Sequence, residues 1–401
     1  MQAPVSREIT FGSLRYLNGL KAACDEHLDR PLRAKDSSVY ALLIVGAYQL
    51  HFMKTPKHAA INETVAACKL IDRPWASKLA NAILRKIAKT ERSFDLMEQL
   101  HSHLRPLLEN QFSQDPTELA NALLSRAPMT LRVNTRVIAA DAYADQLTQA
   151  GIPHKRAWFP ETIVLDQPMP SRGLPGYAQG EVAIQDGGAQ WAHYLLFGGD
   201  EVQSSSCYLL DACSAPGGKL FHSLEQSDGR LNFVALELEP SRTETMQQIA
   251  QRLGHDVRPM VGNASQDNWW DGKPFSHILL DAPCSGTGTI RRHPDINVLF
   301  RKDRLANDQQ KQLSMLNNLW PMLQPGGSLL YCTCSLLEQE NDQVIEAFVN
   351  QQEGEHRPTS PPSVQTLSLP TGQRTRFGWQ LLPIDPLTDG FYFSLLHKPA
   401  S

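Results

Sequence analysis

The stretch LLDACSAPGGK, residues Leu209–Lys219, constrains the fold more than any other part of the chain. An apolar run that ends in an acid and a glycine-rich turn is a common way for an α/β domain to open a cofactor site. Two later segments, LDAPCSG at Leu280–Gly286 and YCTCS at Tyr331–Ser335, also end apolar runs and should bring a cysteine to the same edge of the sheet. A cofactor loop with two thiols predicts covalent group transfer.

Apolar segments alternate with amphipathic ones from Gln185 onward. We expect strands at Cys207–Asp211, Phe233–Glu237, Val257–Val261, His277–Asp281 and Ser328–Thr333, and helices at Lys219–Ser227, Ser241–Leu253 and Asp308–Leu323. This alternation predicts a Rossmann-like parallel sheet with helices on both faces. Near the end of the chain, Trp379–Leu382 and Phe391–His397 predict an antiparallel hairpin at the sheet edge, and Gln351–Gln373 predicts a surface loop.

The first part of the chain, Arg7–Leu123, carries helical periodicity and little strand signal, most clearly at Val39–Met53 and Ala59–Lys86. Helix-on-helix packing buries such apolar stripes, so we expect an all-α bundle. After a break at Ala127-Pro128, the pattern predicts a strand at Met129–Val133 and a helix at Ala139–Ala150 that ends at Gly151.

Short strand-like pieces at Ile163–Leu165 and Val182–Ile184 complete a small α/β insert. The sequence therefore predicts three domains, a helical one at 1–124, the insert at 125–184 and the Rossmann-like domain at 185–401.

Composition limits the class of protein. With 401 residues, 41% hydrophobic and 20% charged, the chain should fold into two or three globular domains. We find no signal peptide and no membrane-spanning run, which predicts a soluble cytoplasmic protein. The seven cysteines lack the spacing of a disulfide framework, so reduced thiols are expected. A net charge of −4 restricts nucleic-acid binding to local basic patches.

The glycine loop matches neither G-x-G-x-x-G nor G-x-x-x-x-G-K-[ST], which disfavours dinucleotides and nucleoside triphosphates. Glu237 ends the second predicted strand, where a carboxylate holds a ribose diol. Together these features favour S-adenosylmethionine. The alternative for Glu237 is a plain strand cap.

Asp281-Ala282-Pro283-Cys284 is the decisive chemical segment. Methyltransferases that act on exocyclic amines commonly place an aromatic residue where Cys284 stands. A thiolate that adds to carbon 6 of cytosine makes carbon 5 nucleophilic enough to accept a methyl group, which explains the cysteine. Asp281 is placed to supply or orient a proton at ring N3.

Two thiols allow two roles, a nucleophile and a helper in release, and sequence physics alone does not distinguish Cys284 from Cys334. The alternative is that free cysteines are small buried hydrophobes, which we prefer for Cys332. A metal site formed by Cys213, Cys284, Cys332 and Cys334 is disfavoured because a C-x-C pair on a strand spaces its ligands poorly, so no metal is expected.

With the loop, the acid, DAPCSGTG and TCS in this order, the chain strongly resembles the RNA cytosine-C5 methyltransferases, and within them the bacterial RsmB (Fmu, Sun) family that acts on small-subunit ribosomal RNA. The likeness extends to LRVN at Leu131–Asn134, RRHPD at Arg291–Asp295 and DGF at Asp389–Phe391. Arg7–Leu123 resembles the family's NusB-like helical domain, of which the first helix or two are expected to be missing. The resemblance implies that the helical domain at 1–124 binds RNA and that the insert at 125–184 contacts it.

The resemblance implies methylation of carbon 5 of a cytosine in 16S ribosomal RNA, with Cys334 as nucleophile, Cys284 as the thiol that assists release, and Asp281 as the third catalytic residue. It implies an S-adenosylmethionine site made of Cys213, Ser214, Ala215, Pro216, Gly217, Gly218, Lys219, Glu237, Arg242, Asn263 and Asp281. Asn263 stands where relatives usually carry Asp, and Ser214 where Ala is usual.

The expected partner is small-subunit ribosomal RNA, naked or in an early assembly particle, bound by a monomer. The candidate RNA-binding residues are Arg132, Asn134, Arg291, Arg292 and His293. They lie in or near two basic stretches, although a run of charges is more often a solvated face. Three alternative functions are a non-catalytic RNA-binding or ribosome-assembly factor, methylation of another RNA such as tRNA, and a nucleotide-dependent oxidoreductase.

Overall fold

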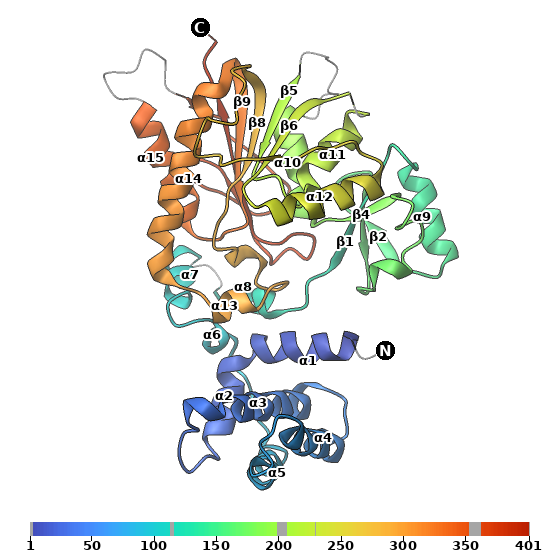
Figure 1. Cartoon of the computed structure of the whole chain (residues 1–401), viewed down its shortest axis with the longest axis vertical. Coiled ribbons are helices and arrows are strands. Elements are labelled where there is room, and N and C mark those ends of the chain that lie inside the picture. Colours follow the sequence, from blue (N-terminus) through green and yellow to red (C-terminus); the bar gives the residue numbers. More distant parts are fainter. Residues whose placement is uncertain (1–2, 113–115, 199–206, 229, 353–361, 401) are drawn as a thin grey trace. The chain divides into compact units, whose positions relative to one another are not determined.

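The computed structural model describes residues 3–112, 116–198, 207–228, 230–352 and 362–400. They form two compact units (Figure 1). The helical unit comprises Met1–Ser125 together with Ile290–Phe300, and the catalytic unit comprises Arg126–Thr289 and Arg301–Ser401. Among the described residues, no helix combines the length and apolarity needed to cross a bilayer.

The helical unit confirms the all-α bundle. Its α-helices are α1 (Ala3–Arg15), α2 (Leu17–Asp25), α3 (Ser37–Phe52), α4 (Lys57–Leu70), α5 (Ala76–Ile87), α6 (Leu96–Gln99), α7 (Arg105–Gln111), α8 (Pro116–Leu124) and α13 (Asp295–Val298), with a 3-10 turn η1 at Ala34–Asp36. Buried residues such as Leu43, Ile61 and Leu84 form the core of α2 to α5. The periodic stretch Ala59–Lys86 forms parts of two helices, because Pro74 cannot continue α4.

The segment Ile290–Phe300 joins the helical unit from far along the chain. The side-chain amide of Asn297 forms two hydrogen bonds with backbone atoms of this unit. Its Oδ1 accepts from His101 N at 2.8 Å, and its Nδ2 donates to Gln99 O at 2.9 Å. No periodicity in the sequence indicated this addition.

The first part of the catalytic unit is a small antiparallel sheet in the order β2-β3-β1-β4. Its elements are β1 (Met129–Val133), α9 (Ala140–Gln149), β2 (His154–Arg156), β3 (Thr162–Leu165), η2 (Ser171–Gly173) and β4 (Val182–Ile184). Tyr143 and Leu147 of α9 are buried against this sheet. The insert is therefore α/β as expected, while β2 was missed because its three residues are all polar or basic.

The larger sheet has the strand order β11-β12-β13-β9-β8-β5-β6-β7. Its parallel strands are β5 (Tyr208–Ala212), β6 (Asn232–Glu237), β7 (Met260–Val261), β8 (Phe275–Asp281) and β9 (Leu323–Thr333). This confirms the predicted Rossmann-like sheet. From β5 the chain builds outward through β6 and β7, then returns to β8 on the other side, so the strand order reverses beside β5. Ligands of open α/β sheets bind at such a reversal.

Helices cover both faces of this sheet. The elements of one face are α10 (Gly187–Phe197), α11 (Gly218–Gln226) and α12 (Pro240–Leu253), and those of the other are α14 (Leu305–Leu319), η5 (Trp320–Met322) and α15 (Asp342–Gln352). Three 3-10 turns lie in the loops, namely η3 (Thr287–Thr289), η4 (Lys302–Arg304) and η6 (Glu338–Glu340). The helix α10 was not predicted, because it is apolar around most of its circumference and shows little periodicity.

The antiparallel edge is confirmed. The strand β13 (Phe391–His397) lies between β9 and β12 (Trp379–Leu381), antiparallel to both. The predicted loop Gln351–Gln373 is corrected in part, since β10 (Ser363–Val364) pairs with β13 and β11 (Gln373–Arg374) pairs with β12. Residues 353–361 of that loop lie outside the described residues.

Candidate active site

The cofactor loop turns tightly between β5 and α11. Ser214 N donates to Leu236 O of β6 at 2.9 Å, and Ser214 Oγ donates to Asp211 Oδ2 at 2.9 Å. Gly217 has a φ of +99°, and a Cβ there would lie 2.3 Å from the Phe221 ring. Only glycine satisfies both conditions. Gly217 therefore makes the turn that leads into the N-terminal end of α11.

Glu237 ends β6 with only 2% of its surface exposed. Its Oε2 accepts from Ala215 N at 3.2 Å, and its Oε1 accepts from Glu239 N at 3.1 Å and from Arg242 at 3.3 Å. Arg242 also donates to Ala215 O. The structure therefore brings the predicted loop, the acid and Arg242 together at one edge of the sheet.

Asp281 ends β8 and forms an ion pair with Lys219 of α11. The Cys332 thiol donates to the other oxygen of Asp281 at 3.5 Å. Burial lowers the pKa of Lys219, but the opposing effect of the Asp281 charge is larger in sum with its neighbours, so the pKa is raised overall. Lys219 thus stays charged, and Asp281 acts as a hydrogen-bond acceptor in this arrangement.

Asp211, at the end of β5, was not among the predicted site residues. Burial raises its pKa to about 7, with a smaller contribution from Asp281. Its Oδ1 is buried and has no hydrogen-bond partner among the described residues. The acids near this loop outnumber the basic residues, with Asp211, Glu237 and Asp281 against Lys219 and Arg242. This excess of negative charge suits a ligand that carries positive charge.

The two predicted thiols meet. Cys284 follows β8 and Cys334 follows β9, and their Sγ atoms lie 3.5 Å apart. The hydrogen bond with Cys334, together with burial, raises the pKa of Cys284 well above its usual value. Both side chains are partly exposed, whereas Cys332 is fully buried in the core, as preferred from the sequence.

Cys213 holds a left-handed backbone conformation with a φ of +63°. Burial and the nearby carboxylates raise the pKa of its thiol to about 12. At neutral pH Cys213 is therefore protonated, which suits a place in the cofactor loop better than a nucleophilic role.

Glu340 was missed in the sequence, although it joins both cysteine loops. It is fully buried and accepts hydrogen bonds from Ser285 N at 2.7 Å and from the hydroxyls of Ser285 and Ser335. These serines directly follow Cys284 and Cys334. The only available signal is an acid six residues after Cys334, which no spacing rule singles out.

Arg132 and Asn134 are fully buried, which corrects the prediction that their side chains contact RNA. Arg132 forms a double hydrogen bond with Glu225 of α11, at 2.7 and 2.8 Å, and donates to Gly218 O of the cofactor loop at 2.7 Å. Burial alone would raise the pKa of Glu225, but the Arg132 charge together with the hydrogen bonds from His255 and Arg132 lowers the pKa overall.

Asn134 donates to Gly180 O and Leu253 O, both at 3.0 Å. These contacts reach from the small sheet to the end of α12. Arg132 and Asn134 therefore attach the insert to the Rossmann-like domain, and the LRVN motif has a structural explanation.

The remaining predicted site residues lie in both units. Arg291, Arg292 and His293 belong to the helical unit, where Arg291 is 2% exposed, Arg292 is half-buried and His293 is exposed. Asn263 follows β7, and its Oδ1 accepts from Ser265 N at 2.9 Å. An amide oxygen accepts two hydrogen bonds, so a further donor can still bind there.

The strand order, the glycine loop after β5 and the acids that end β5, β6 and β8 define a Rossmann-like methyltransferase domain. Residues 201–397 match the family model described as 16S rRNA methyltransferase RsmB/F, residues 1–89 match the NusB family, and residues 104–172 match the ferredoxin-like domain of RsmF/B-like methyltransferases.

Two relatives named ribosomal RNA small subunit methyltransferase B are similar over nearly the whole chain. The protein from Pseudomonas putida is 38% identical over 99% of this chain and 91% of its own length. That from Vibrio cholerae is 36% identical over 98% of this chain and 88% of its own length. The chain belongs to the RsmB family of ribosomal RNA small subunit methyltransferases.

Solved structures share the fold. The crystal structure of PH0851 has a TM-score of 0.84 and 21% identity, and the match covers 98% of this chain and 90% of that one. NSun6 from Pyrococcus horikoshii with SFG has a TM-score of 0.64 and 17% identity, and the match covers 75% and 98% of the two chains.

Proposed function

We propose that the protein transfers a methyl group from S-adenosylmethionine to carbon 5 of a cytosine in small-subunit ribosomal RNA. The observation that carries this proposal is the meeting of Cys284 and Cys334, 3.5 Å apart, at the sheet edge where Asp281 and Lys219 form an ion pair. The names of the relatives support ribosomal RNA as the substrate.

The residues at the sheet edge fit S-adenosylmethionine. Bound there, it supplies a methyl group made electrophilic by a positively charged sulfur. The buried carboxylates of Asp211 and Glu237 favour this positive charge, and Asp211 Oδ1 still lacks a partner among the described residues. Glu237 is suited to accept hydrogen bonds from ribose hydroxyls, and Asn263 Oδ1 from an adenine amine. The N-terminal N-H groups of α11 are suited to a carboxylate.

In the proposed reaction, the Cys334 thiolate adds to carbon 6 of cytosine and forms a carbon–sulfur bond. The electrons of the carbon 5–carbon 6 double bond are then free to form a bond from carbon 5 to the methyl carbon. The bond from the methyl carbon to the sulfonium sulfur breaks, leaving a neutral thioether. Removal of the carbon 5 proton restores the double bond and expels Cys334 as a thiolate.

We assign Asp281 and Lys219 the role of orienting the cytosine ring. Because Asp281 already accepts from Lys219, it is suited to orient cytosine as an acceptor, and the charged Lys219 ammonium is the hydrogen-bond donor of the pair. The charge of Cys334 contributes to the raised pKa of Lys219, which means that the ammonium group also attracts negative charge on that sulfur.

Cys284 suits the release step. Because its raised pKa keeps it protonated in the free protein, it is a poor nucleophile there. Once Cys334 is bonded to carbon 6, its hydrogen bond and charge no longer raise the pKa of Cys284. Cys284 can then give its own proton to water, and the resulting thiolate accepts the carbon 5 proton.

The target cytosine must leave its stack to reach the partly exposed thiols, so an exposed loop nucleotide of naked RNA or of an early assembly particle is the proposed substrate. Arg292 and His293 stay candidates for RNA contact. We propose that the enzyme acts as a monomer in the cytoplasm, where ribosomal RNA is found in bacteria.

The test is methyl transfer from radiolabelled S-adenosylmethionine to small-subunit ribosomal RNA, with bisulfite sequencing of the product. We expect 5-methylcytosine with the wild-type protein and none when both Cys284 and Cys334 are changed to alanine. Methylation of tRNA alone would change the substrate. Unchanged methylation by the double variant would overturn the covalent mechanism.

A further inference from the structure

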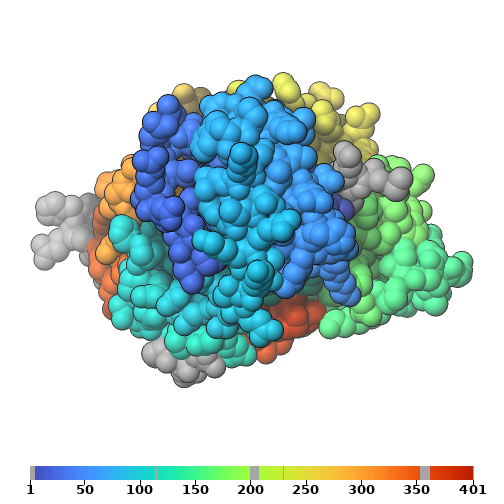
Figure 2. Space-filling model, turned by 90° about the horizontal axis from the view of Figure 1, so that it is seen from below, coloured from blue at the N-terminus to red at the C-terminus, as the bar shows by residue number. Residues whose placement is uncertain are grey.

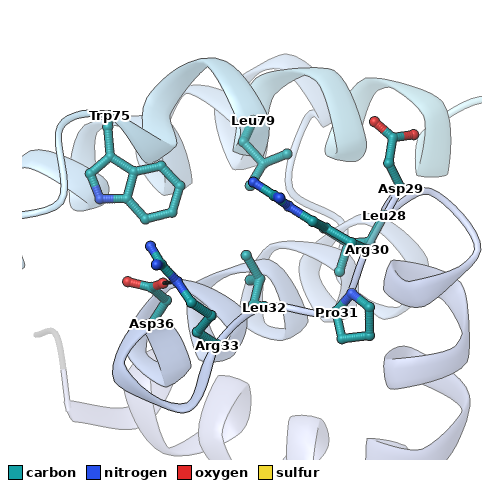
Figure 3. A pocket seen from close by; sticks show the side chains of 9 residues that line it. All are labelled: Leu28, Asp29, Arg30, Pro31, Leu32, Arg33, Asp36, Trp75 and Leu79. Atoms are coloured by element: carbon teal, nitrogen blue, oxygen red, sulfur yellow. Dashed lines mark ion pairs between the residues drawn. The ribbon is translucent and has the colours of Figure 1, made fainter.

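The helical unit contains a cavity of about 440 Å³ between the connection that follows α2 and the start of α5 (Figure 3). Leu28, Leu32 and Leu79 are its apolar lining and pack against the core of the unit. The apolar lining of the cavity thus adjoins the folded core. Figure 2 shows a face of this unit, in blue to cyan, in space-filling form.

Trp75 forms an aromatic wall of the cavity and is 52% exposed. In Figure 3 its indole lies on the opposite side of the cavity from Leu32, with the Arg33 guanidinium below it. Among the residues that the structure describes, no other ring stacks on Trp75. An exposed, flat indole at the edge of a cavity is the kind of surface on which an unpaired nucleobase stacks.

The charged residues that line the cavity are two arginines, Arg30 and Arg33, and two acids, Asp29 and Asp36. Arg30 has no ion pair or hydrogen bond with any described residue, and its side chain reaches across toward Leu79. Arg33 pairs with Asp36 at 3.5 Å, yet 75% of its side chain is exposed. Residues 1–125 contain 16 Lys and Arg against 13 Asp and Glu in a chain whose net charge is −4. The cavity therefore lies in a part of the chain that carries net positive charge, which favours the approach of phosphates.

We infer that this cavity binds one nucleotide of single-stranded RNA, with its base stacked on Trp75 and its phosphate beside Arg30 and Arg33. The volume lies within the range of small-ligand pockets, about 300–1,000 Å³. This inference rests on the proposed function, in which the substrate is RNA. It adds a nucleotide site in the helical unit to the site of methyl transfer in the catalytic unit.

The experiment measures the affinity of the full chain for a fluorescein-labelled oligouridylate by fluorescence anisotropy at several salt concentrations. We expect Trp75→Ala to weaken binding roughly fivefold or more, the lower end of what one stacked base contributes, and Trp75→Phe to keep most of it. Arg30→Gln should weaken binding and reduce the slope of log affinity against log salt by about 0.7, the loss of one phosphate contact.

Two matched controls change exposed residues of the same unit outside the cavity. Leu70→Ala removes an apolar side chain that is 84% exposed, and Arg85→Gln removes one charge from α5. Both should bind the oligonucleotide as the wild type does. Circular dichroism of each variant is the check that the variant is folded.

Wild-type affinity in both Trp75→Ala and Arg30→Gln would overturn the inference. If, in addition, Trp75→Ala loses activity on ribosomal particles but not on naked RNA, the cavity binds a protein of the particle instead. Methyl transfer is measured in a separate assay, as described for the proposed function. A wild-type protein that binds the oligonucleotide through Trp75 but makes no 5-methylcytosine would contradict the proposed function and leave the nucleotide site standing.

Discussion

The sulfur atoms of Cys284 and Cys334 lie 3.5 Å apart, although the two residues follow different strands and are 50 positions apart in the sequence. Their strands, β8 and β9, are parallel neighbours, so both thiols reach the same edge. The Glu340 carboxylate fixes the residue after each cysteine. The pair is therefore a property of the fold.

The first prediction concerns the roles of the two thiols. With S-adenosylmethionine and RNA, Cys284→Ala should accumulate a covalent protein–RNA adduct, because the carbon 5 proton is no longer removed. Cys334→Ala should be inactive and form none, since no carbon 6 bond is made. Denaturing gel electrophoresis with labelled RNA separates the two. Adduct formation by Cys334→Ala instead would reverse the assignment.

The second prediction concerns Glu340. An amide cannot accept hydrogen bonds from both serines and the Ser285 N-H as the carboxylate does, so Glu340→Gln should let the cysteine loops move. We expect the methyl-transfer rate to fall by at least about tenfold, with the affinity for S-adenosylmethionine unchanged. Glu338→Gln, an exposed neighbour in the same turn, is the control. Equal rates in the two variants would refute a positioning role for Glu340.

The third prediction concerns cofactor affinity. Glu237→Gln removes the negative charge at the end of β6, and we expect calorimetry to show about 10- to 100-fold weaker binding of S-adenosylmethionine. Glu239→Gln changes an exposed acid two residues away and should bind as the wild type does. RNA affinity should be the same in both. A Glu237→Gln protein with normal calorimetry would show that this acid only caps its strand.

The fourth prediction concerns the buried ion pair of Arg132 and Glu225. Arg132→Met leaves a buried carboxylate without its partner, which should cost about 3–5 kcal/mol in the free energy of unfolding. The control, Arg376→Gln, breaks an exposed pair with Glu346 in the same unit and should cost at most about 1 kcal/mol. Urea denaturation compares them. Adding Glu225→Gln to Arg132→Met should restore part of the loss; no restoration would argue against the ion pair as the cause.

The fifth prediction concerns pH. Burial lowers the pKa of His193 to about 3, with smaller effects from His222 and Arg132, and burial lowers the pKa of His277 to about 4. An unfolded histidine has a pKa of about 6.5. As pH falls below about 6.5, the unfolded chain therefore takes up protons that the folded chain does not. The contribution of these two histidines to stability should be complete above that pH and be lost toward about pH 4, offset in part by Asp211, whose raised pKa acts in the opposite direction.

The loss should approach roughly 1.4 kcal/mol per pH unit for each histidine. Urea denaturation at a series of pH values measures it. His193→Asn and His277→Asn should each make the dependence less steep, and an unaltered pH profile in both variants would show that other groups control acid stability.

The sequence predicted the features that depend on local patterns. Apolar runs placed β5, β6, β8 and β9, and the residues that end them placed Glu237, Asp281, Cys284 and Cys334 at one edge. Long-range pairing was not predictable in the same way. Arg132 resembles a surface arginine in the sequence because its partner Glu225 lies 93 residues further on.

Glu340 was not predicted from the sequence for a similar reason. It contacts the residue after Cys284 as well as the residue after Cys334, and only the fold reveals that one carboxylate serves both. The nucleotide cavity is also a product of tertiary structure, since Arg30 and Trp75 are 45 positions apart and neither belongs to a recognisable motif.

The return of Ile290–Phe300 to the helical unit has a consequence for synthesis. A nascent chain that has emerged only as far as Ser125 lacks Asn297, so the Gln99 carbonyl and the His101 amide do not yet have their partner. Completion of the helical unit must wait until most of the catalytic unit has been translated. An excised fragment that stops at Ser125 should accordingly show faster amide hydrogen exchange at His101 than the intact protein.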